Sequence, residues 1–293
     1  GLMATGGSTN LGLHLPAMAR AAGIELTLED FDDISSVTPL MAKVYPNGLA
    51  DVNHFHAAGG LSYMIGELLA DGLLHQDVKT VVGDGLDMYQ TEPKLTPAGL
   101  EFHPAATQSQ NEKILRPARN PFQPSGGLKQ LSGNLGHGVI KISAVAPERH
   151  MIEAPVRVFH SQEAVKEAFK NNEITTDTIV VVRFQGPMAN GMPELHGLTP
   201  TLAVLQDRGL RIALVTDGRM SGASGKVPAA IHISPEAAAG GPIAKLQDGD
   251  IMRLDAITGQ IEVLSKGFSA RAPVTMDLSD NKHGVGRELF EMF

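Results

Sequence analysis

The sequence predicts a mixed α/β protein in two parts. Residues 1 to about 90 carry apolar residues at helical spacing between short strand candidates. Residues 91 to about 127 are rich in Pro, Gln, Asn and Gly, and β-branched runs dominate beyond them. This order predicts a largely helical first part, a linker or extended crossing segment, and a second part built mostly of strands.

Three helices are predicted in the first part. One follows the glycine turn Gly6–Asn10, in which Asn10 is a candidate capping residue. A capping box formed by Thr27 and Asp30 opens the second. The third follows the apolar spacing within 61–69, and a short strand is expected at 79–82.

The second part contains β-branched and apolar runs that predict strands, and a turn at 257–259 that predicts a hairpin. The strands are expected at 138–145, 156–159, 178–184, 211–215, 229–233, 251–254 and 260–264. Helices are expected at 162–170, 199–206 and 277–291.

Composition narrows the class of protein. The 293 residues are 42% hydrophobic and 19% charged, which is ordinary for a globular chain with a sizeable core. The net charge of −8 disfavours nonspecific nucleic-acid binding. No apolar run is long enough to span a bilayer and no signal peptide is visible, so a cytoplasmic protein without membrane partners is expected. The start at Gly1, without an initiator Met, suggests a fragment of a longer protein.

The strongest candidate for chemistry is Thr216–Gly225, which follows the apolar run 212–215. Loops at the carboxyl ends of buried strands often form active sites, and small residues there present backbone N–H groups. A tight surface loop is the simpler interpretation. No glycines stand two positions either side of Ser221, and Met220 replaces the first glycine of a phosphate-binding loop, so neither of those motifs is present. Ser221 is therefore the first candidate.

A second loop, Gly186–Glu194, follows the predicted strand 178–184. A carboxylate at the end of a Gly/Pro loop suits a hard divalent cation or a general base. The simpler interpretation is a solvated Glu194 that caps the next helix. Because this loop and the one containing Ser221 both follow buried strands, a shared cleft is expected.

Weaker candidates lie elsewhere. Ser132–Gly136 could donate Asn134 amide and backbone N–H groups to a substrate oxygen, or could form only a turn. His54 and His56 would share one face on a strand but diverge on a helix, so structural or substrate-contact roles are favoured over a zinc site. Gly6–Asn10 could bind an anion at a helix start or could simply begin a helix.

Four motifs in this order resemble the dihydroxy-acid and sugar-acid dehydratase family over essentially the whole chain. They are Gly6–Asn10, Ser132–Leu135, Gly186–Glu194 and Thr216–Gly222. The segment 45–55 and Met220 are similar to the branch of the family that acts on phosphogluconate. The resemblance therefore implies a hydro-lyase that converts 6-phospho-D-gluconate to 2-dehydro-3-deoxy-6-phospho-D-gluconate in the Entner–Doudoroff pathway of gluconate utilization. Another dihydroxy-acid or sugar-acid dehydratase is the close alternative.

The resemblance also implies roles for residues and cofactors. Ser221 would be an alkoxide base, and Glu194 a ligand of a divalent cation, Mg or Mn. An iron–sulfur cluster of the 4Fe-4S type would act as a Lewis acid. Its cysteine ligands are absent from this chain, so the chain alone should be inactive. The candidate substrate contacts are Ser8, Thr9, Asn10, Asn134, Arg219, Gly222, Ser224, His54 and His56.

The domain organisation implied by the resemblance has two parts. Residues 1–105 would end an α/β/α cluster-bearing domain, and 106–293 would form a swivelling β-barrel-like α/β domain. The implied partners are the missing N-terminal half, a sugar-acid phosphate and a second copy in a homodimer. Two alternatives from other classes stay open: a stand-alone noncatalytic ligand-binding module, and a metal hydrolase that uses His54 and His56.

Overall fold

The computed structural model describes residues 1–221 and 226–282. These residues form two compact units, and each is described by itself. Unit 1 consists of Gly1–Gly7 and Asp33–Gly127. Unit 2 consists of Ser8–Asp32 and the chain from Leu128 onward. The predicted boundary near residue 105 stays a prediction.

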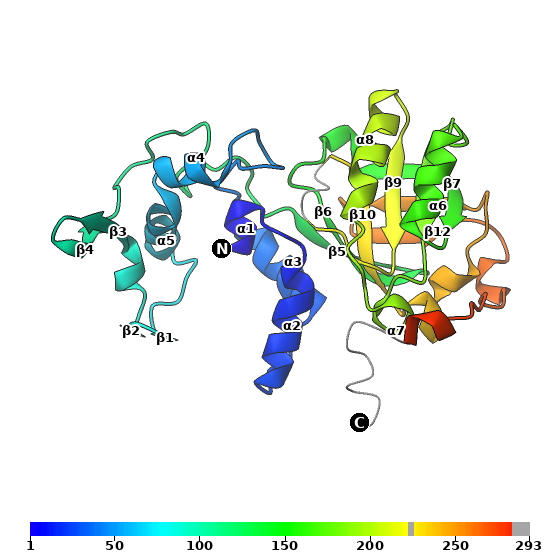
Figure 1. Cartoon of the computed structure of the whole chain (residues 1–293), viewed down its shortest axis with the longest axis horizontal. Helices are drawn as coiled ribbons and strands as arrows, with labels where there is room; N and C mark the ends of the chain where they lie inside the picture. The colour runs from blue at the N-terminus through cyan, green and yellow to red at the C-terminus, as the bar shows by residue number, and fades with distance from the viewer. Residues whose placement is uncertain (222–225, 283–293) are drawn as a thin grey trace. The chain divides into compact units, whose positions relative to one another are not determined.

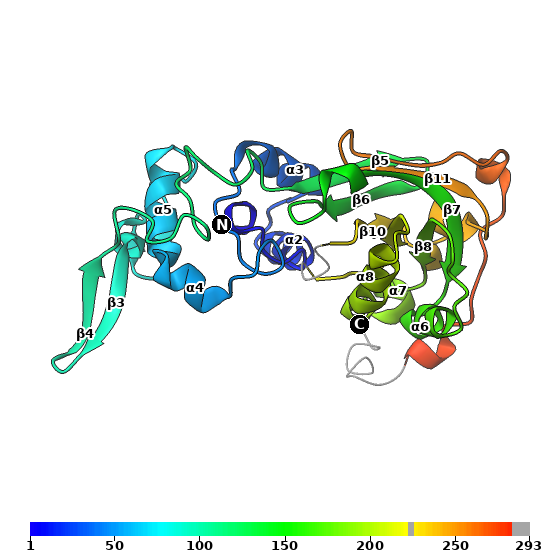
Figure 2. The same ribbon diagram turned by 90° about the horizontal axis from the view of Figure 1, so that it is seen from above.

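Unit 1 contains short helices and two separate two-stranded antiparallel sheets (Figures 1 and 2). Its helices are α1 Leu2–Thr5, the end of α3 Leu28–Val37, α4 Val52–Ala57, α5 Gly60–Ala70 and the 3-10 helix η1 Asp87–Gln90. Its strands are β1 Lys79–Thr80, β2 Gly83–Asp84, β3 Thr91–Thr96 and β4 Gly99–Pro104. The start of α3 belongs to unit 2, and the capping box predicted there is confirmed: the Thr27 N–H donates to Asp30 Oδ2 and the Asp30 N–H donates to the Thr27 hydroxyl.

The core of unit 1 forms where α5 packs against the extended segments that flank it. Tyr63, Met64 and Leu68 of α5 are buried with Met41 and Leu115. The predicted linker at 91–127 is wrong in its first part, because β3 and β4 pair in register there, Leu95 opposite Leu100. Pro93, Pro97, Gly99 and Pro104, which contributed to the linker prediction, lie within and between these two strands.

Unit 2 is built around a closed barrel of eight strands in the order β10-β6-β5-β12-β11-β7-β8-β9. The strands are β5 Leu128–Gly133, β6 Gly136–Lys141, β7 Met151–Phe159, β8 Thr178–Val182, β9 Ile212–Thr216, β10 Ala229–Ser234, β11 Ile251–Asp255 and β12 Gln260–Val263. The helices are α2 Leu11–Ala21, α6 Gln162–Lys170, α7 Pro187–Asn190 and α8 Thr199–Asp207. Short 3-10 helices are η2 Pro147–Arg149, η3 His196–Leu198, η5 Ala237–Ala239, η6 Pro242–Lys245, η7 Phe268–Ala270 and η8 Ser279–Lys282. Strand β5 was not predicted, since it has no β-branched residue.

Strands β7, β8, β9 and β10 run parallel, and the remaining pairs are antiparallel apart from a single parallel β12–β5 contact. Every residue of β8 and β9 is buried. Helices α6 and α8 lie over this parallel half (Figure 1), which explains why these strands carry continuous apolar runs instead of alternating ones. The inward side chains of the barrel strands form one continuous core.

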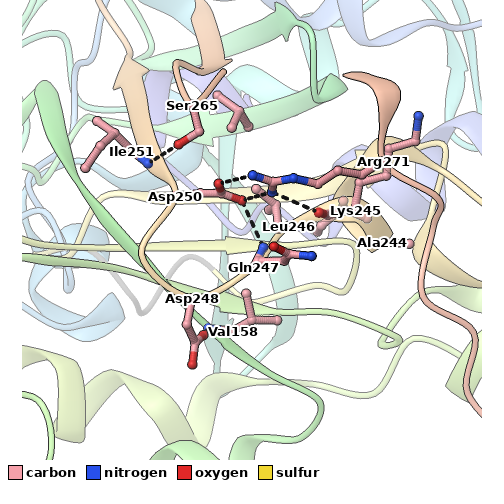
Figure 3. Close-up of polar contacts among 12 residues, drawn as sticks. Val158, Ala244, Lys245, Leu246, Gln247, Asp248, Asp250, Ile251, Ser265 and Arg271 are labelled. Atoms are coloured by element: carbon pink, nitrogen blue, oxygen red, sulfur yellow. Dashed lines mark hydrogen bonds and ion pairs between the residues drawn. The ribbon is translucent and has the colours of Figure 1, made fainter. Parts of the chain in front are cut away.

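An ion pair between Arg271 and Asp250 holds the segment that follows β12 against the start of β11. Arg271 donates from Nη1 and Nη2 to the two Asp250 carboxylate oxygens at 2.5 and 2.8 Å, and the Gln247 N–H donates to Asp250 Oδ2 (Figure 3). Ser265 binds the Ile251 N–H beside them. Burial alone would raise the pKa of Asp250, but the bonds from Arg271, Gln247 and Ser265 lower it below its ordinary value. Both charges of this pair are therefore satisfied within the protein, so the pair needs no ligand.

The mixed α/β class and the barrel of the second part are confirmed. The α/β/α arrangement of the first domain and the swivelling of the second stay predictions. A C-terminal α-helix was expected at 277–291, and the structure describes its first residues, 277–282. The prediction is wrong for these residues, because they form only the 3-10 helix η8 at Ser279–Lys282. Within the described ranges, no helix is long and apolar enough to cross a membrane.

Candidate active site

The candidate site is positioned by two neighbouring parallel strands. Val182 at the end of β8 is paired with Thr216 at the end of β9, so the loops that follow leave the barrel side by side. The first loop leads through α7 to Glu194, and the second leads to Ser221. This is the strand-end placement where open parallel sheets usually bind ligands.

Asp217 ties these loops together from inside the protein. It is 1% exposed, and its carboxylate accepts the backbone N–H groups of Phe184, Gln185 and Ala237 at 2.9 to 3.1 Å. Burial raises the pKa of Asp217, and the three N–H donors oppose that rise. A Cβ at Gly218 would lie 2.7 Å from the Gln185 side chain, so glycine permits this close approach. The carboxylate is therefore a structural clamp beneath the site.

Glu194 joins the two loops at the surface. Its Oε1 accepts the Ser221 backbone N–H at 2.7 Å, and its Oε2 lies 3.3 Å from Arg219 Nη1. Arg219 also donates from Nε to the Met192 carbonyl at 2.8 Å. The structure thus brings Glu194, Arg219 and Ser221 together, whereas the shared cleft stays a prediction.

The segment before α2 reaches the same place. Thr9 is buried and donates its hydroxyl to the Met220 carbonyl at 2.7 Å. Asn10 directs its Nδ2 toward Glu194 Oε2 at 3.5 Å, a weak contact. Ser8 Oγ accepts the Asn10 N–H at 3.2 Å. Asn10 stands at the N-cap of α2 but its side chain does not cap the helix, so that expectation is wrong. Its amide faces the Glu194–Arg219 pair instead.

Other predicted residues are engaged elsewhere. The Asn134 amide donates to the Val263 carbonyl and accepts the Val263 N–H, at 2.9 and 2.8 Å, which fastens the β5–β6 turn to β12. This bonding favours the structural interpretation of that turn. A substrate role for Asn134 stays a prediction, and Gly222 and Ser224 lie outside the described residues.

His54 and His56 of unit 1 do not form a metal pair. Both lie on α4, where Asp51 and His54 form a reciprocal capping box and His56 Nε2 lies 3.4 Å from Glu92. On a helix, residues two positions apart point in different directions, so the two imidazoles diverge as predicted for a helix. Within the described part of the chain, no group of three His, Asp or Glu side chains is arranged to hold a metal ion.

Backbone strain gathers around the site. Phe184, Met192 and His232 have φ of 62°, 57° and 57°, a left-handed conformation that residues other than glycine rarely adopt. Phe184 follows β8, Met192 precedes Glu194, and His232 lies where the β10–β6 register shifts. Strained residues and bulges concentrate at functional sites. Sequence reasoning missed His232; the only signal was a polar residue between Ile231 and Ile233.

A cavity of about 520 Å³ adjoins these residues in unit 2. It is lined by Gly12, Leu13, Pro16, Leu26, Thr27, Leu28, Pro187, Met188, Met192, Asp217, His232, Ile233, Ser234, Pro235, Glu236 and Ala239. Glu236 is itself occupied, since its carboxylate accepts the N–H groups of Met188 and Ala189 at the start of α7. The cavity is therefore mainly apolar, and His232 is a polar side chain in its wall that sequence reasoning did not select.

The residues present do not form a cofactor site by themselves. The chain has no cysteine, so it cannot supply thiolates to an iron–sulfur cluster. Glu194 could be one oxygen ligand of a divalent cation, but its carboxylate is engaged by Ser221 and Arg219 here. A cation would need further ligands and a displaced Arg219.

The sequence matches two family models. Residues 1–89 match the N-terminal model of the dihydroxy-acid/6-phosphogluconate dehydratases, and residues 113–291 match the C-terminal model. The chain therefore belongs to the dihydroxy-acid/6-phosphogluconate dehydratase family, which confirms the resemblance found in its motifs.

Curated relatives refine the comparison within the family. The chain is 58% identical to a phosphogluconate dehydratase of Rhizobium meliloti (strain 1021), over all of this chain and 49% of the relative. It is 54% identical to the protein of that name from Escherichia coli (strain K12), over 99% and 48%. A dihydroxy-acid dehydratase of Sulfurisphaera tokodaii is 41% identical over 89% and 45%. The chain spans about half the length of these relatives.

Proposed function

We propose that this chain is part of a phosphogluconate dehydratase, a hydro-lyase of carbohydrate metabolism in the Entner–Doudoroff pathway. Its substrate would be 6-phospho-D-gluconate and its product 2-dehydro-3-deoxy-6-phospho-D-gluconate. The observation that carries the proposal is the direct bond between the Ser221 backbone and the Glu194 carboxylate, beside Arg219. The names of the relatives at 51 to 58% identity support the choice of substrate.

The reaction removes one water from the sugar acid. Ser221 Oγ, as the alkoxide, accepts the proton from C2, and the electron pair of that C–H bond forms the C2–C3 double bond. The C3–O bond breaks, and the leaving hydroxyl takes up a proton and departs as water. The enol at C2 then tautomerises to the ketone. These steps balance without an oxidant or reductant.

A serine hydroxyl is a weak base, so its surroundings must favour the alkoxide. Arg219, two residues away, carries a positive charge, and the Glu194 bond fixes the backbone from which the Ser221 side chain projects. Arg219 is itself held by the Met192 carbonyl, so its charge is fixed in place. Pre-organised charge of this kind is the largest single contribution in many enzymes.

The proposal for the longer protein also includes two metal groups, a moving domain and a second subunit. An iron–sulfur cluster of the 4Fe-4S type would supply a Lewis acid for the leaving hydroxyl, with cysteine ligands from residues outside this chain. Glu194 would become one ligand of Mg or Mn. A swivelling second domain, a homodimer and a cytoplasmic location complete the proposal, and further residues of the longer protein would complete the site.

The test is Ser221→Ala in the full-length protein, with turnover measured on 6-phosphogluconate and gluconate. This substitution keeps the backbone N–H that binds Glu194. General base catalysis contributes about 10²- to 10⁴-fold, so kcat should fall by at least about 10²-fold with an unchanged Tm. Ser36→Ala, at an exposed serine whose hydroxyl bonds only the Asp33 carbonyl of its own helix, should retain activity. Near-normal turnover by Ser221→Ala would remove the proposed base, and wild-type turnover of unphosphorylated acids alone would overturn the substrate and favour another sugar-acid dehydratase.

A further inference from the structure

His232 is held in an unusual position on β10. The pairing of β10 with β6 shifts between Ile231 and Ser234, and His232 within that shift has φ of 57°. Its backbone N–H donates to the Gly218 carbonyl at 2.9 Å. The bulge therefore takes residue 232 out of the strand ladder and ties it to the loop of Ser221. Surrounding contacts must offset the free energy that such a conformation costs.

Two buried polar atoms beside the site lack a hydrogen bond. Among the residues that the structure describes, His232 Nε2 and Asn10 Oδ1 are fully buried and have no partner. The Asn10 oxygen points away from Glu194 because the Nδ2 group of the same amide faces that carboxylate. A buried polar atom without a hydrogen bond lowers the stability of the folded state. Two of them near the same ion pair indicate a place for a polar ligand.

His232 and Asn10 both lie near the N-terminal end of α2. A Cβ at Gly12 would be 3.9 Å from His232 Cε1, so the imidazole edge faces the first turn of α2, which Asn10 precedes. His232 also lines the 520 Å³ cavity with Gly12 and Met192. The charges of Arg219 and Glu194 both reach the imidazole. His232 therefore lies near the Glu194–Arg219 pair as well as in the wall of the cavity.

The chemistry of these atoms selects the ligand group. Burial, followed by the charge of Arg219, lowers the pKa of His232 to about 4, so its imidazole is neutral at pH 7. A neutral imidazole nitrogen donates or accepts one hydrogen bond, and an amide oxygen only accepts. A carboxylate or a phosphate dianion has no hydrogen to give Asn10 Oδ1. A hydroxyl group can both donate and accept, so it satisfies either atom.

We propose that His232 Nε2 and Asn10 Oδ1 form a subsite that binds hydroxyl groups on the carbon chain of the substrate. This inference rests on the proposed function, because it assigns part of a polyhydroxy acid to the cavity. His232 is then a specificity-determining residue whose side chain touches the substrate away from C2 and C3.

The test compares His232→Asn with His232→Gln in the full-length protein. An Asn side chain is too short to place a polar atom where Nε2 lies, whereas a Gln amide reaches that position. Asn also tolerates positive φ well, so His232→Asn should fold. We expect His232→Asn to raise KM for 6-phosphogluconate about tenfold, the equivalent of one hydrogen bond of about 1.4 kcal/mol, and His232→Gln to restore most of the loss.

Analogues of 6-phosphogluconate that lack the C4 or the C5 hydroxyl sharpen the test. Calorimetry measures their binding to the full-length protein without turnover. One analogue should bind the wild type about tenfold more weakly than its parent, and His232→Asn should bind parent and analogue equally. The matched control is His160→Asn, because His160 is also partly buried but its Nε2 accepts bonds from Arg183. That control should lower the Tm without changing the preference between parent and analogue.

The outcomes separate the two proposals. If the wild type neither binds nor dehydrates 6-phosphogluconate, the proposed function fails. If the wild type does both and His232→Asn keeps the wild-type KM and the wild-type preference between parent and analogue, this inference alone is overturned. In that case the two atoms serve a structural water. A fall in Tm of His232→Asn with unchanged substrate binding would also contradict the subsite.

Discussion

Two arginine–carboxylate pairs of unit 2 have opposite characters. Asp250 is 4% exposed, and its carboxylate is fully engaged by Arg271 and Gln247 (Figure 3). The Glu194 side chain is 31% exposed, Arg219 touches it through one nitrogen at 3.3 Å, and unpaired polar atoms lie beside it. The first pair completes a packing contact, whereas the second remains available to a ligand. The same chemistry therefore serves stability in one place and binding in the other.

The largest expected effect separates the two pairs by activity. Glu194→Gln keeps an oxygen for the Ser221 N–H but removes the charge that holds Arg219. A small displacement of reacting groups costs about 10²-fold in rate, so kcat of the full-length protein should fall by about that factor. The Tm should change little, because the pair is partly exposed. Wild-type kcat in this variant would show that the pair is only a surface contact.

The converse effect is expected at the Asp250–Arg271 pair. Asp250→Asn removes the charge that receives two bonds from Arg271, and hydrogen bonds to charged groups contribute about 1.5 to 3 kcal/mol. The free energy of unfolding should fall by about 2 kcal/mol in urea denaturation, while KM and kcat stay within twofold. Loss of catalysis with intact stability would reverse the roles of the two pairs.

The pH dependence of stability distinguishes Asp250 from the clamp residue Asp217. The folded state lowers the pKa of Asp250 below 3.8, so its stabilisation is complete above that pH and is lost as the pH falls through the folded pKa. The folded state raises the pKa of Asp217, so the protein gains stability from this group as the pH falls through the raised pKa toward 3.8. The measurement is the urea midpoint of each variant minus that of the wild type, between pH 3 and 7. As the pH falls, the destabilisation caused by Asp250→Asn should become smaller, whereas that caused by Asp217→Asn should become larger. Parallel changes would contradict the assignment.

The smallest effect concerns the contact between Thr9 and the loop of Ser221. Thr9→Val removes one neutral hydrogen bond to the Met220 carbonyl and keeps the shape of the side chain. The expected loss is about 1 kcal/mol of unfolding free energy, read from the urea midpoint. The matched control is Thr80→Val, whose exposed hydroxyl bonds only its own turn. Equal effects of the two variants would mean that the Thr9 contact adds nothing to the site.

The sequence was sufficient to predict the features that depend on local pattern. The buried strands β8 and β9 and the loops with Glu194 and Ser221 were found because apolar runs end in small polar residues there. Strand β5 and the β3–β4 hairpin were missed, since the first lacks β-branched residues and the second contains Pro and Gly. The roles of Asp217 and His232 depend on a clamp and a bulge that form only when distant strands pair. Such contacts leave no periodic signal.

The most direct test of the account is a double-mutant cycle of kcat/KM with Glu194→Gln and Ser221→Ala in the full-length protein. If the Glu194 carboxylate acts by positioning Ser221, its substitution should cost little once the Ser221 hydroxyl is gone, so the two losses should be far from additive. Losses that multiply fully would show that the two residues act independently and would contradict the shared site.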